Sequence, residues 1–153
     1  MDSAHALPPS LLGLETYLLS RVGKVARGRF ADRLAARGLR LWHMAVLAAL
    51  ADFGPHAQRD LGIRLDIHPS DVAKIVDELA SAGQVERTRD PADRRRMSVR
   101  ITRTGRGLLR DLDKEAGQVR DEILAPLRQN ERIVLADLML RLFEHTHPDT
   151  GAD

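Results

Sequence analysis

The hydrophobic period of the chain changes once, and this change constrains the fold more than any other feature. From residue 11 to residue 83, apolar side chains recur every three or four positions, which is typical of amphipathic helices. Residues 84–87 and 97–101 instead alternate apolar with polar or charged side chains, which predicts two short strands. The segment between them contains Asp90-Pro91, a turn-forming pair, so the strands should form a hairpin. The helical period returns after Gly105.

The helical segments are bounded by glycine and proline. A long helix is predicted from Leu11 to about Ala36, with Gly38 as its C-terminal signal. A second helix around Trp42–Leu50 should stop before Gly54-Pro55, and a short third helix holds residues 58–65. The fourth ends at Gly83. Two more are predicted after the hairpin, one from residue 104 and a last one for which Asn130 is a suitable N-cap.

The turn at residues 66–70 joins the third and fourth helices. Pro69 is placed for a first helical position, and the following helix has one apolar stripe (Val72, Ile75, Val76, Leu79). Its other face presents Ser70, Asp71 and Lys74. Two helices joined in this way are typical of helix-turn-helix DNA readers, and many helical hairpins look alike. A hairpin that follows directly makes the combination a winged helix, which is far more specific.

We therefore expect a mainly α (α+β) fold in a single domain spanning 1–153. Residues 40–102 form the winged helix-turn-helix with its two-stranded β wing. The long terminal helices, 11–36 and 104–146, have amphipathic faces that need a partner. They either fold back on their own domain or pair in a homodimer, and we favour the homodimer because one wing alone makes few contacts.

Positive charge is concentrated on the predicted hairpin. Residues 84–110 contain nine arginines, no lysine and three acidic residues, whereas residues 111–153 contain five basic and ten acidic residues. Arginine is suited to phosphate and groove contacts. The alternative is a solvated basic face, or a basic hairpin that binds an acidic protein.

Several function classes are excluded on composition and motifs. The chain has no cysteine, so disulfides, thiolate zinc sites and thiol chemistry are ruled out. No Gly-rich phosphate loop, nucleophile elbow or carboxylate pair suggests an enzyme, and no cofactor is expected. His145 and His147 near Asp149 lack a further fixed ligand, so no metal site is expected. No apolar run is long enough to span a membrane and no signal peptide is visible, which predicts a soluble, cytoplasmic, nucleoid-associated protein.

The segment from Arg89 to Gly105 closely resembles the wing signature of the multiple-antibiotic-resistance-regulator (MarR) family. Upstream, the family's reading-head segment and second helix are matched by these residues: Gln58–Leu61, Leu65, Pro69-Ser70, Val72, Val76–Leu79, Gly83, Trp42 and Val46–Leu50. The resemblance covers roughly residues 11–145. It implies a homodimeric winged-helix transcription regulator, usually a repressor that leaves pseudopalindromic double-stranded DNA when a small aromatic or phenolic ligand binds. A DNA-binding protein without any effector is the alternative.

The resemblance also assigns roles to individual residues. Arg95 would enter the minor groove while Asp93 holds a neighbouring guanidinium, the alternative being a surface ion pair. Ser70 and Lys74 would reach the major groove. Asp71 departs from the family's usual Ser or Thr and is suited to accept a hydrogen bond from a cytosine amino group. Phosphate contacts are expected from Arg87, Arg89, Arg94 and Arg96, while Gln58 either touches a phosphate or caps its helix.

The effector site is the least determined prediction. In the resembled family the pocket lies beside the dimer interface, between the first, second and fifth helices. Tyr17, Arg21, Trp42 and His43 are the candidates to line it, with Arg21 or His43 pairing an acid. Trp42 also fits the apolar stripe of its helix as a core residue, and His43 is equally compatible with an ordinary hydrogen-bonded or exposed histidine.

Overall fold

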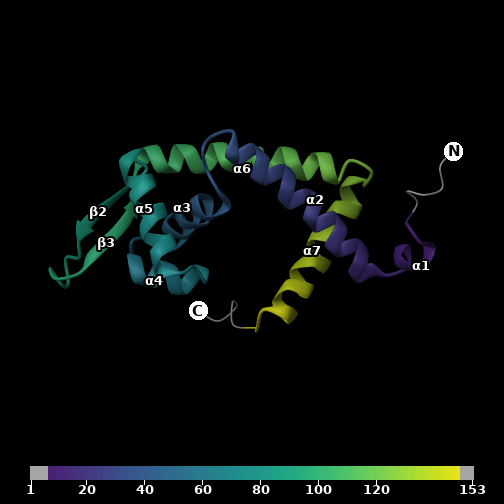
Figure 1. Cartoon of the computed structure of the whole chain (residues 1–153), viewed down its shortest axis with the longest axis horizontal. Helices are drawn as coiled ribbons and strands as arrows, with labels where there is room; N and C mark the ends of the chain where they lie inside the picture. Colours follow the sequence, from purple (N-terminus) through teal and green to yellow (C-terminus); the bar gives the residue numbers. More distant parts are fainter. Residues whose placement is uncertain (1–6, 149–153) are drawn as a thin grey trace.

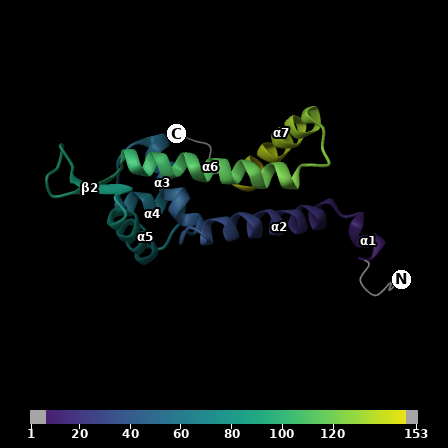
Figure 2. The same ribbon diagram turned by 90° about the horizontal axis from the view of Figure 1, so that it is seen from above.

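The computed structural model describes residues 7–148, which form seven helices and three strands (Figures 1 and 2). In chain order they are α1 (Pro9–Leu12), α2 (Glu15–Ala35), α3 (Leu41–Phe53), β1 (His56–Ala57), α4 (Gln58–Leu65), α5 (Pro69–Ser81), β2 (Val85–Arg89), β3 (Met97–Ile101), α6 (Arg103–Ile123) and α7 (Gln129–Thr146). The fold is the mainly helical winged helix-turn-helix that the sequence predicts. We call residues 41–101 the head, and α1, α2, α6 and α7 the arm.

The head contains the hydrophobic core. One cluster of buried apolar side chains joins α3, α4, α5 and the sheet, and all its members lie in the head: Val46, Leu47, Ala49, Leu50, Leu61, Ile67, Val72, Ile75, Val76, Leu79, Val85 and Val99. The predicted stripe of α5 is fully buried in this cluster. Asp66 adopts the left-handed conformation (φ 50°, ψ 49°) that the turn before α5 requires, because aspartate tolerates it better than most residues.

The predicted hairpin is confirmed, and a third strand extends it. β2 and β3 pair antiparallel from Val85↔Ile101 to Arg89↔Met97. The two-residue β1 pairs with the other edge of β3, so the strand order is β1-β3-β2. A two-residue strand has no period to detect, which is why the sequence predicted only two strands.

Two helix boundaries differ from the prediction. The first predicted helix is split, because Gly13 ends α1 and Leu14 is extended (φ −103°, ψ 108°) before α2 begins. Asn130 is not the N-cap of α7, so that prediction is wrong. The helix starts at Gln129, and the Glu131 carboxylate accepts a hydrogen bond (2.8 Å) from the backbone N–H of the N-cap residue, Arg128.

The arm extends away from the head. α6 starts at the base of the sheet and packs along α2, and α7 then turns back at the far end, so that the wing and α1 lie at opposite ends of the molecule (Figures 1 and 2). α7 contains no buried residue. Large apolar side chains of the arm are exposed along α1, α2 and α7: Leu12, Leu14, Leu18, Leu19, Val22, Val25, Ile133, Val134, Leu138, Met139, Leu140, Leu142 and Phe143.

Candidate nucleic-acid interface

Helix α5, the second helix of the helix-turn-helix, begins with a side-chain cap. Nδ1 of His68, the N-cap residue, accepts a hydrogen bond (3.2 Å) from the backbone N–H of Ser70 and lies 2.7 Å from the Ser70 hydroxyl oxygen. Because Nδ1 acts as an acceptor, the ring proton belongs on Nε2, and the Ser70 hydroxyl donates to Nδ1. Ser70 keeps its oxygen lone pairs available on the exposed side.

Asp71 and Lys74 are also exposed on α5, as predicted. Asp71 lies in the first turn, where the helix dipole favours an acid. Within residues 7–148 neither side chain makes a hydrogen bond or ion pair. Ser70 and Lys74 are one turn apart, so α5 presents a short polar face beside its buried stripe.

Two aspartates stabilise the turns in the loop between β2 and β3, at the tip of the wing. Asp93 Oδ1 accepts from the backbone N–H of Arg95 (3.0 Å), and the Asp93 carbonyl accepts from that of Arg96 (2.9 Å). Asp90 Oδ1 likewise accepts from the Ala92 N–H (2.8 Å). The predicted bond from Asp93 to a guanidinium is absent in the described chain, because its short side chain bonds the local backbone instead. Asp93 therefore fixes the backbone of Arg95.

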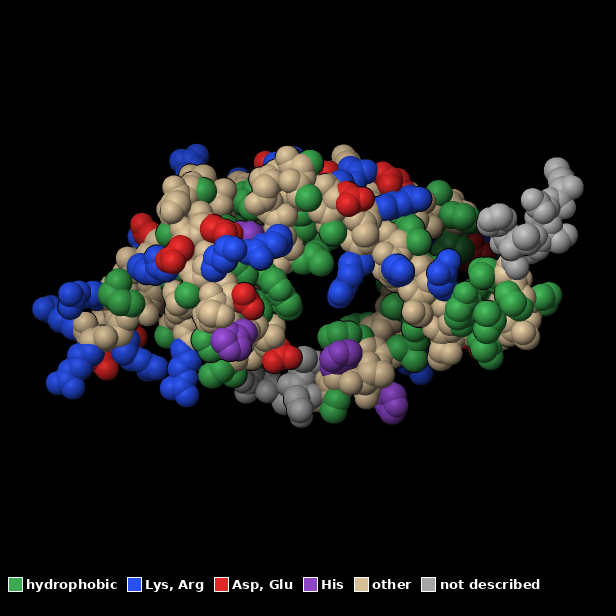
Figure 3. Space-filling model, in the orientation of Figure 1, with side chains coloured by type: hydrophobic (Ala, Val, Ile, Leu, Met, Phe, Trp, Pro, Cys, Tyr) green, Lys and Arg blue, Asp and Glu red, His purple; other side chains and the backbone are tan. Residues whose placement is uncertain are grey.

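Three consecutive arginines, Arg94, Arg95 and Arg96, occupy the exposed tip of the wing. In the part of the chain that the structure describes, none of their guanidinium groups has a hydrogen bond or an ion pair. Arg89 donates to the backbone carbonyl of Arg94 (3.3 Å). Lysine and arginine side chains gather at this end of the molecule (Figure 3). The wing tip therefore presents uncompensated positive charge to solvent.

Arg87, in contrast, has partners on the surface of the head. Its guanidinium forms an ion pair with Asp77 of α5 and donates a hydrogen bond (3.3 Å) to Oε1 of Gln58, the first residue of α4. Gln58 does not cap α4, so that alternative is wrong. Asp77 was not among the residues predicted for the site. The sequence could have pointed to it, because it is a carboxylate on the exposed face of a helix that was expected to approach DNA.

The neighbouring acid, Glu78, connects α5 to α3. The buried His43 accepts a hydrogen bond (2.9 Å) from the backbone N–H of Arg40 at Nδ1, so Nε2 carries the proton and donates to Glu78 Oε2 at 2.6 Å. This hydrogen bond lowers the pKa of Glu78 below its ordinary value, and the charges of Arg40 and Lys74 act in the same direction. His43 is thus a hydrogen-bonded core histidine, one of the alternatives left open.

The four candidate effector residues are not brought together within one protomer. Tyr17 and Arg21 lie near the start of α2, whereas Trp42 and His43 follow its end. At 1.5 Å per residue, roughly 27 Å of helix separates Tyr17 from Ala35. Trp42 is 44% exposed, so the expectation that it packs in the core is wrong. The rest of its stripe, including Val46 and Leu50, is buried in the core.

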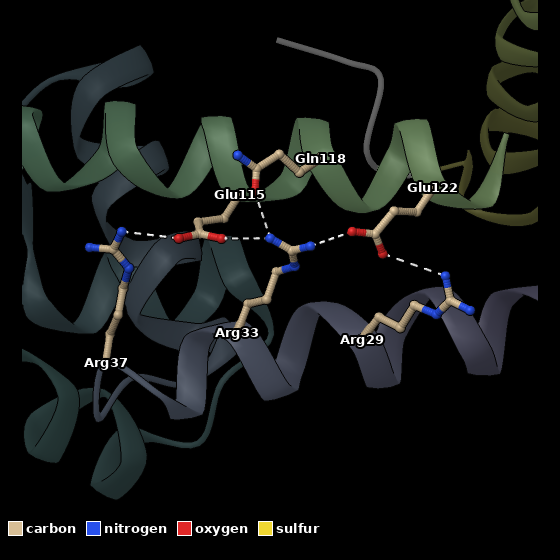
Figure 4. Close-up of polar contacts among 6 residues, drawn as sticks. All are labelled: Arg29, Arg33, Arg37, Glu115, Gln118 and Glu122. Atoms are coloured by element: carbon tan, nitrogen blue, oxygen red, sulfur yellow. Dashed lines mark hydrogen bonds and ion pairs between the residues drawn. The ribbon is translucent and has the colours of Figure 1, made fainter. Parts of the chain in front are cut away.

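A charged network that the sequence analysis did not foresee joins α2 to α6 (Figure 4). Arg33 donates to Glu115 (3.0 Å) and to Gln118 (2.6 Å), and it also pairs with Glu122. Arg37 donates to Glu115 from the next turn (3.0 Å). Hydrogen bonds from Arg33 and then Arg37 lower the pKa of Glu115, and the bond to Glu115 raises that of Arg33. These contacts hold α2 against α6 within the arm.

An apolar groove of about 1060 Å³ lies in the arm. It runs between the first half of α2, the end of α6 and α7, and its walls include Leu18, Val22, Ile133 and Met139. Arg120, Asp121 and Arg132 also line it. The groove is open to solvent in the single chain.

Other site classes find no support in the described residues. Within residues 7–148, no three His, Asp or Glu side chains are grouped to hold a metal ion. His145 and His147 lie in this range, but Asp149 lies outside the described residues. Over the same residues, no helix has the length and hydropathy needed to cross a bilayer.

Comparison with known proteins agrees with this geometry. The MarR family model matches residues 41–97, which is nearly the whole head. The HTH-type transcriptional regulator YdgJ of Bacillus subtilis is 31% identical over 126 residues, covering 82% of this chain and 75% of YdgJ. The HTH-type transcriptional repressor NicR of Pseudomonas putida is 29% identical over 98 residues, covering 64% of this chain and 62% of NicR.

Structural comparison extends the similarity to the arm. The PcaV transcriptional regulator of Streptomyces coelicolor, solved in complex with its natural ligand, superposes with a TM-score of 0.65 at 27% identity. The match covers 91% of this chain and 96% of PcaV, which is more than the head alone. Head, wing and arm thus share their arrangement and part of their sequence with these proteins, and the chain belongs to the MarR family of transcriptional regulators.

Proposed function

We propose that this chain acts as a homodimeric repressor that binds a pseudopalindromic DNA site and leaves it when a small ligand binds. The observation that carries the proposal is the wing tip. Arg94, Arg95 and Arg96 are exposed and have no side-chain partner in the described residues, and they lie directly beyond a helix-turn-helix. A cluster of unpaired arginines on a projecting hairpin suits the narrow, negative minor groove.

In this proposal α5 occupies the major groove. Ser70 and Lys74 reach base edges or phosphates, and Asp71 accepts a hydrogen bond from a cytosine amino group. Arg95 enters the adjacent minor groove with its backbone fixed by Asp93, and Arg89, Arg94 and Arg96 contact phosphates. The hydrogen bond between Ser70 and His68 supports the proposed contact of Ser70 with DNA, because it orients the Ser70 hydroxyl before DNA binds.

The arm supports dimerisation through 11–36 and 104–146. Apolar side chains exposed over α2 and α7 and an open groove between them cost free energy in water, and a second copy would cover both. A two-fold dimer would present two reading helices to successive major grooves.

Dimerisation is tested by placing a charge in the groove. Val22→Asp should raise the dimer dissociation constant by at least about tenfold, because a buried carboxylate without a partner is costly. Ser20→Asp adds the same charge to the opposite side of α2 and should leave the dimer intact. Analytical ultracentrifugation of both variants measures this. Equal dissociation constants for both variants would contradict an interface at the groove.

For the effector, we propose a small aromatic or phenolic molecule bound beside the junction of head and arm. The support is the half-exposed Trp42 next to Arg40 and His43, and the natural ligand present in the PcaV structure. Tyr17 or Arg21 can contribute only from a second copy or to a separate site, given their distance along α2. Thermal shift and DNA release with benzoate, salicylate and 4-hydroxybenzoate test this. If no such compound changes either quantity, the effector-independent alternative is favoured.

The proposed DNA site is tested by selection. Duplexes of random sequence retained by the purified chain should be enriched in an inverted repeat whose half-sites lie about one helical turn, 10–10.5 base pairs, apart. Each retained duplex should bind two copies of the chain. A helical protein-interaction module with a basic hairpin, the alternative of a different class, predicts salt-sensitive retention without any enriched sequence.

A further inference from the structure

Arg87 is the one arginine of the wing strands whose guanidinium reaches both helices of the helix-turn-helix, as far as the described residues show. From β2 it pairs with Asp77 on α5 and donates to Gln58 at the start of α4. Its side chain is 33% exposed. A single cation therefore connects the wing strand to each helix of the reading unit.

The position of Asp77 gives a physical reason for its ion pair with Arg87. It lies three residues after Lys74 and seven after Ser70, so it shares their exposed face of α5. A carboxylate there is unfavourable because, in the proposed complex, it approaches the phosphates of the DNA. Pairing with Arg87 neutralises it.

The same pairing changes what Arg87 contributes to DNA. A guanidinium that is paired with a carboxylate adds little net charge, so it releases few counterions from DNA. It does restrain the angle between β2 and α5, and hence the position of the wing tip relative to the reading helix. Arg89, two residues further on the same side of the strand, has no such partner and bonds only the Arg94 carbonyl within the described chain.

We propose that Arg87, together with Asp77 and Gln58, is a positioning residue that sets the distance between the major-groove and minor-groove contacts, and is not a phosphate contact. The inference rests on the proposed DNA-binding function, and it replaces the role predicted for Arg87 from the sequence. It makes Arg87 and Asp77 determinants of preference for the selected site over other DNA. Arg89 remains a contact that acts on all sequences alike.

The experiment is a double-mutant cycle in DNA binding. Fluorescence anisotropy with the selected duplex and with a scrambled duplex is recorded at several salt concentrations for wild type, Arg87→Ala, Asp77→Asn, the double variant and Arg89→Ala. We expect Arg87→Ala and Asp77→Asn each to weaken binding to the selected duplex by about three- to tenfold, with the double variant no weaker than either. The salt slope of the double variant, which removes both charges of the pair, should equal that of wild type.

Arg89→Ala is the matched control. It should lower the salt slope by about one unit and weaken binding to both duplexes equally. Arg87→Lys, which keeps the charge but not the planar fork, should restore part of the preference. The proposal is overturned if Asp77→Asn tightens binding while Arg87→Ala lowers the salt slope by about one unit, since Arg87 is then a phosphate contact that Asp77 opposes.

Thermal unfolding of the same variants tests the bridge without DNA. The effects of Arg87→Ala and Asp77→Asn on the unfolding midpoint should be non-additive, because each removes the same interaction. Additive effects would contradict the bridge whatever the DNA result. A wild-type chain that prefers no duplex contradicts the proposed function instead, and this is seen before any variant is compared.

Discussion

The head and the arm use the same apolar residues with opposite results. Leu47 and Leu50 of the head are 0% and 1% exposed, whereas Leu138 and Leu142 of the arm are 45% and 51% exposed. The head is a complete hydrophobic core within one chain. In the arm, α2 and α6 bury Leu34, Leu112 and Val119 between them and the head, but the chain itself leaves most apolar side chains of α2 and α7 exposed. The stability of the arm should therefore depend on a second copy, and that of the head should not.

The largest effect on stability should come from replacing a leucine by alanine, once in the head and once in the arm. Leu47→Ala removes a fully buried side chain and should lower the free energy of unfolding by about 2–5 kcal/mol at every protein concentration. Leu142→Ala should instead act through association, so its effect on the unfolding midpoint should shrink as the chain is diluted. Denaturation at two widely separated concentrations measures both. Concentration-independent effects of both substitutions would remove the distinction between head and arm.

Two glycines of α6 sharpen the boundary between the regions. A Cβ at Gly105 would lie 2.0 Å from the backbone oxygen of Gln84, so Gly105→Ala should push α6 off the sheet and cost about 1–3 kcal/mol. At Gly107 the nearest atom is the end of the Arg110 side chain at 3.8 Å, so Gly107→Ala should stabilise the helix by about 0.5–1 kcal/mol. Unfolding curves give both values. Effects of the same sign would mean that α6 does not approach the sheet this closely.

The smallest effect concerns the ion pairs that hold α2 against α6 within the arm. Because the folded pKa of Glu115 lies below its ordinary 4.5, its ion pairs stabilise the fold above that pH and are lost as the pH falls through the lowered value. Glu115→Gln should therefore lower the unfolding midpoint at neutral pH, and the difference from wild type should vanish in acid. Asp113→Asn, on the same helix and without a partner in the described residues, is the control. A difference independent of pH would argue against the ion pairs.

The sequence was most informative where one local rule decides the structure. The buried stripe of α5 and the alternating wing strands depend on periodicity, and both were predicted. The exposed arginines of the wing tip followed from the same hairpin. Family resemblance rested on these segments.

The sequence was least informative where a side chain contacts residues that are distant along the chain. The alternation of β2 gives the side on which Arg87 lies, but not that Asp77 meets it there. Periodicity placed Trp42 on the same apolar stripe as the buried Val46 and Leu50, but it does not say how far along the helix the core extends. Asn130 was a suitable N-cap by type, yet Glu131 fixes an earlier start through the backbone of Arg128. In each case the structure depends on which of several possible contacts the side chain makes, and a local sequence pattern does not give this.

The most direct test of DNA reading by the wing is the salt dependence of binding of wild type and Arg95→Ala to the selected duplex. Arg95→Ala should weaken binding and reduce the salt slope by about one unit, with sequence preference largely retained. Arg120→Ala, which removes an arginine of the arm paired with Asp121, should leave the slope unchanged. If wild type and Arg95→Ala bind duplex DNA equally poorly at low salt, the wing does not read DNA.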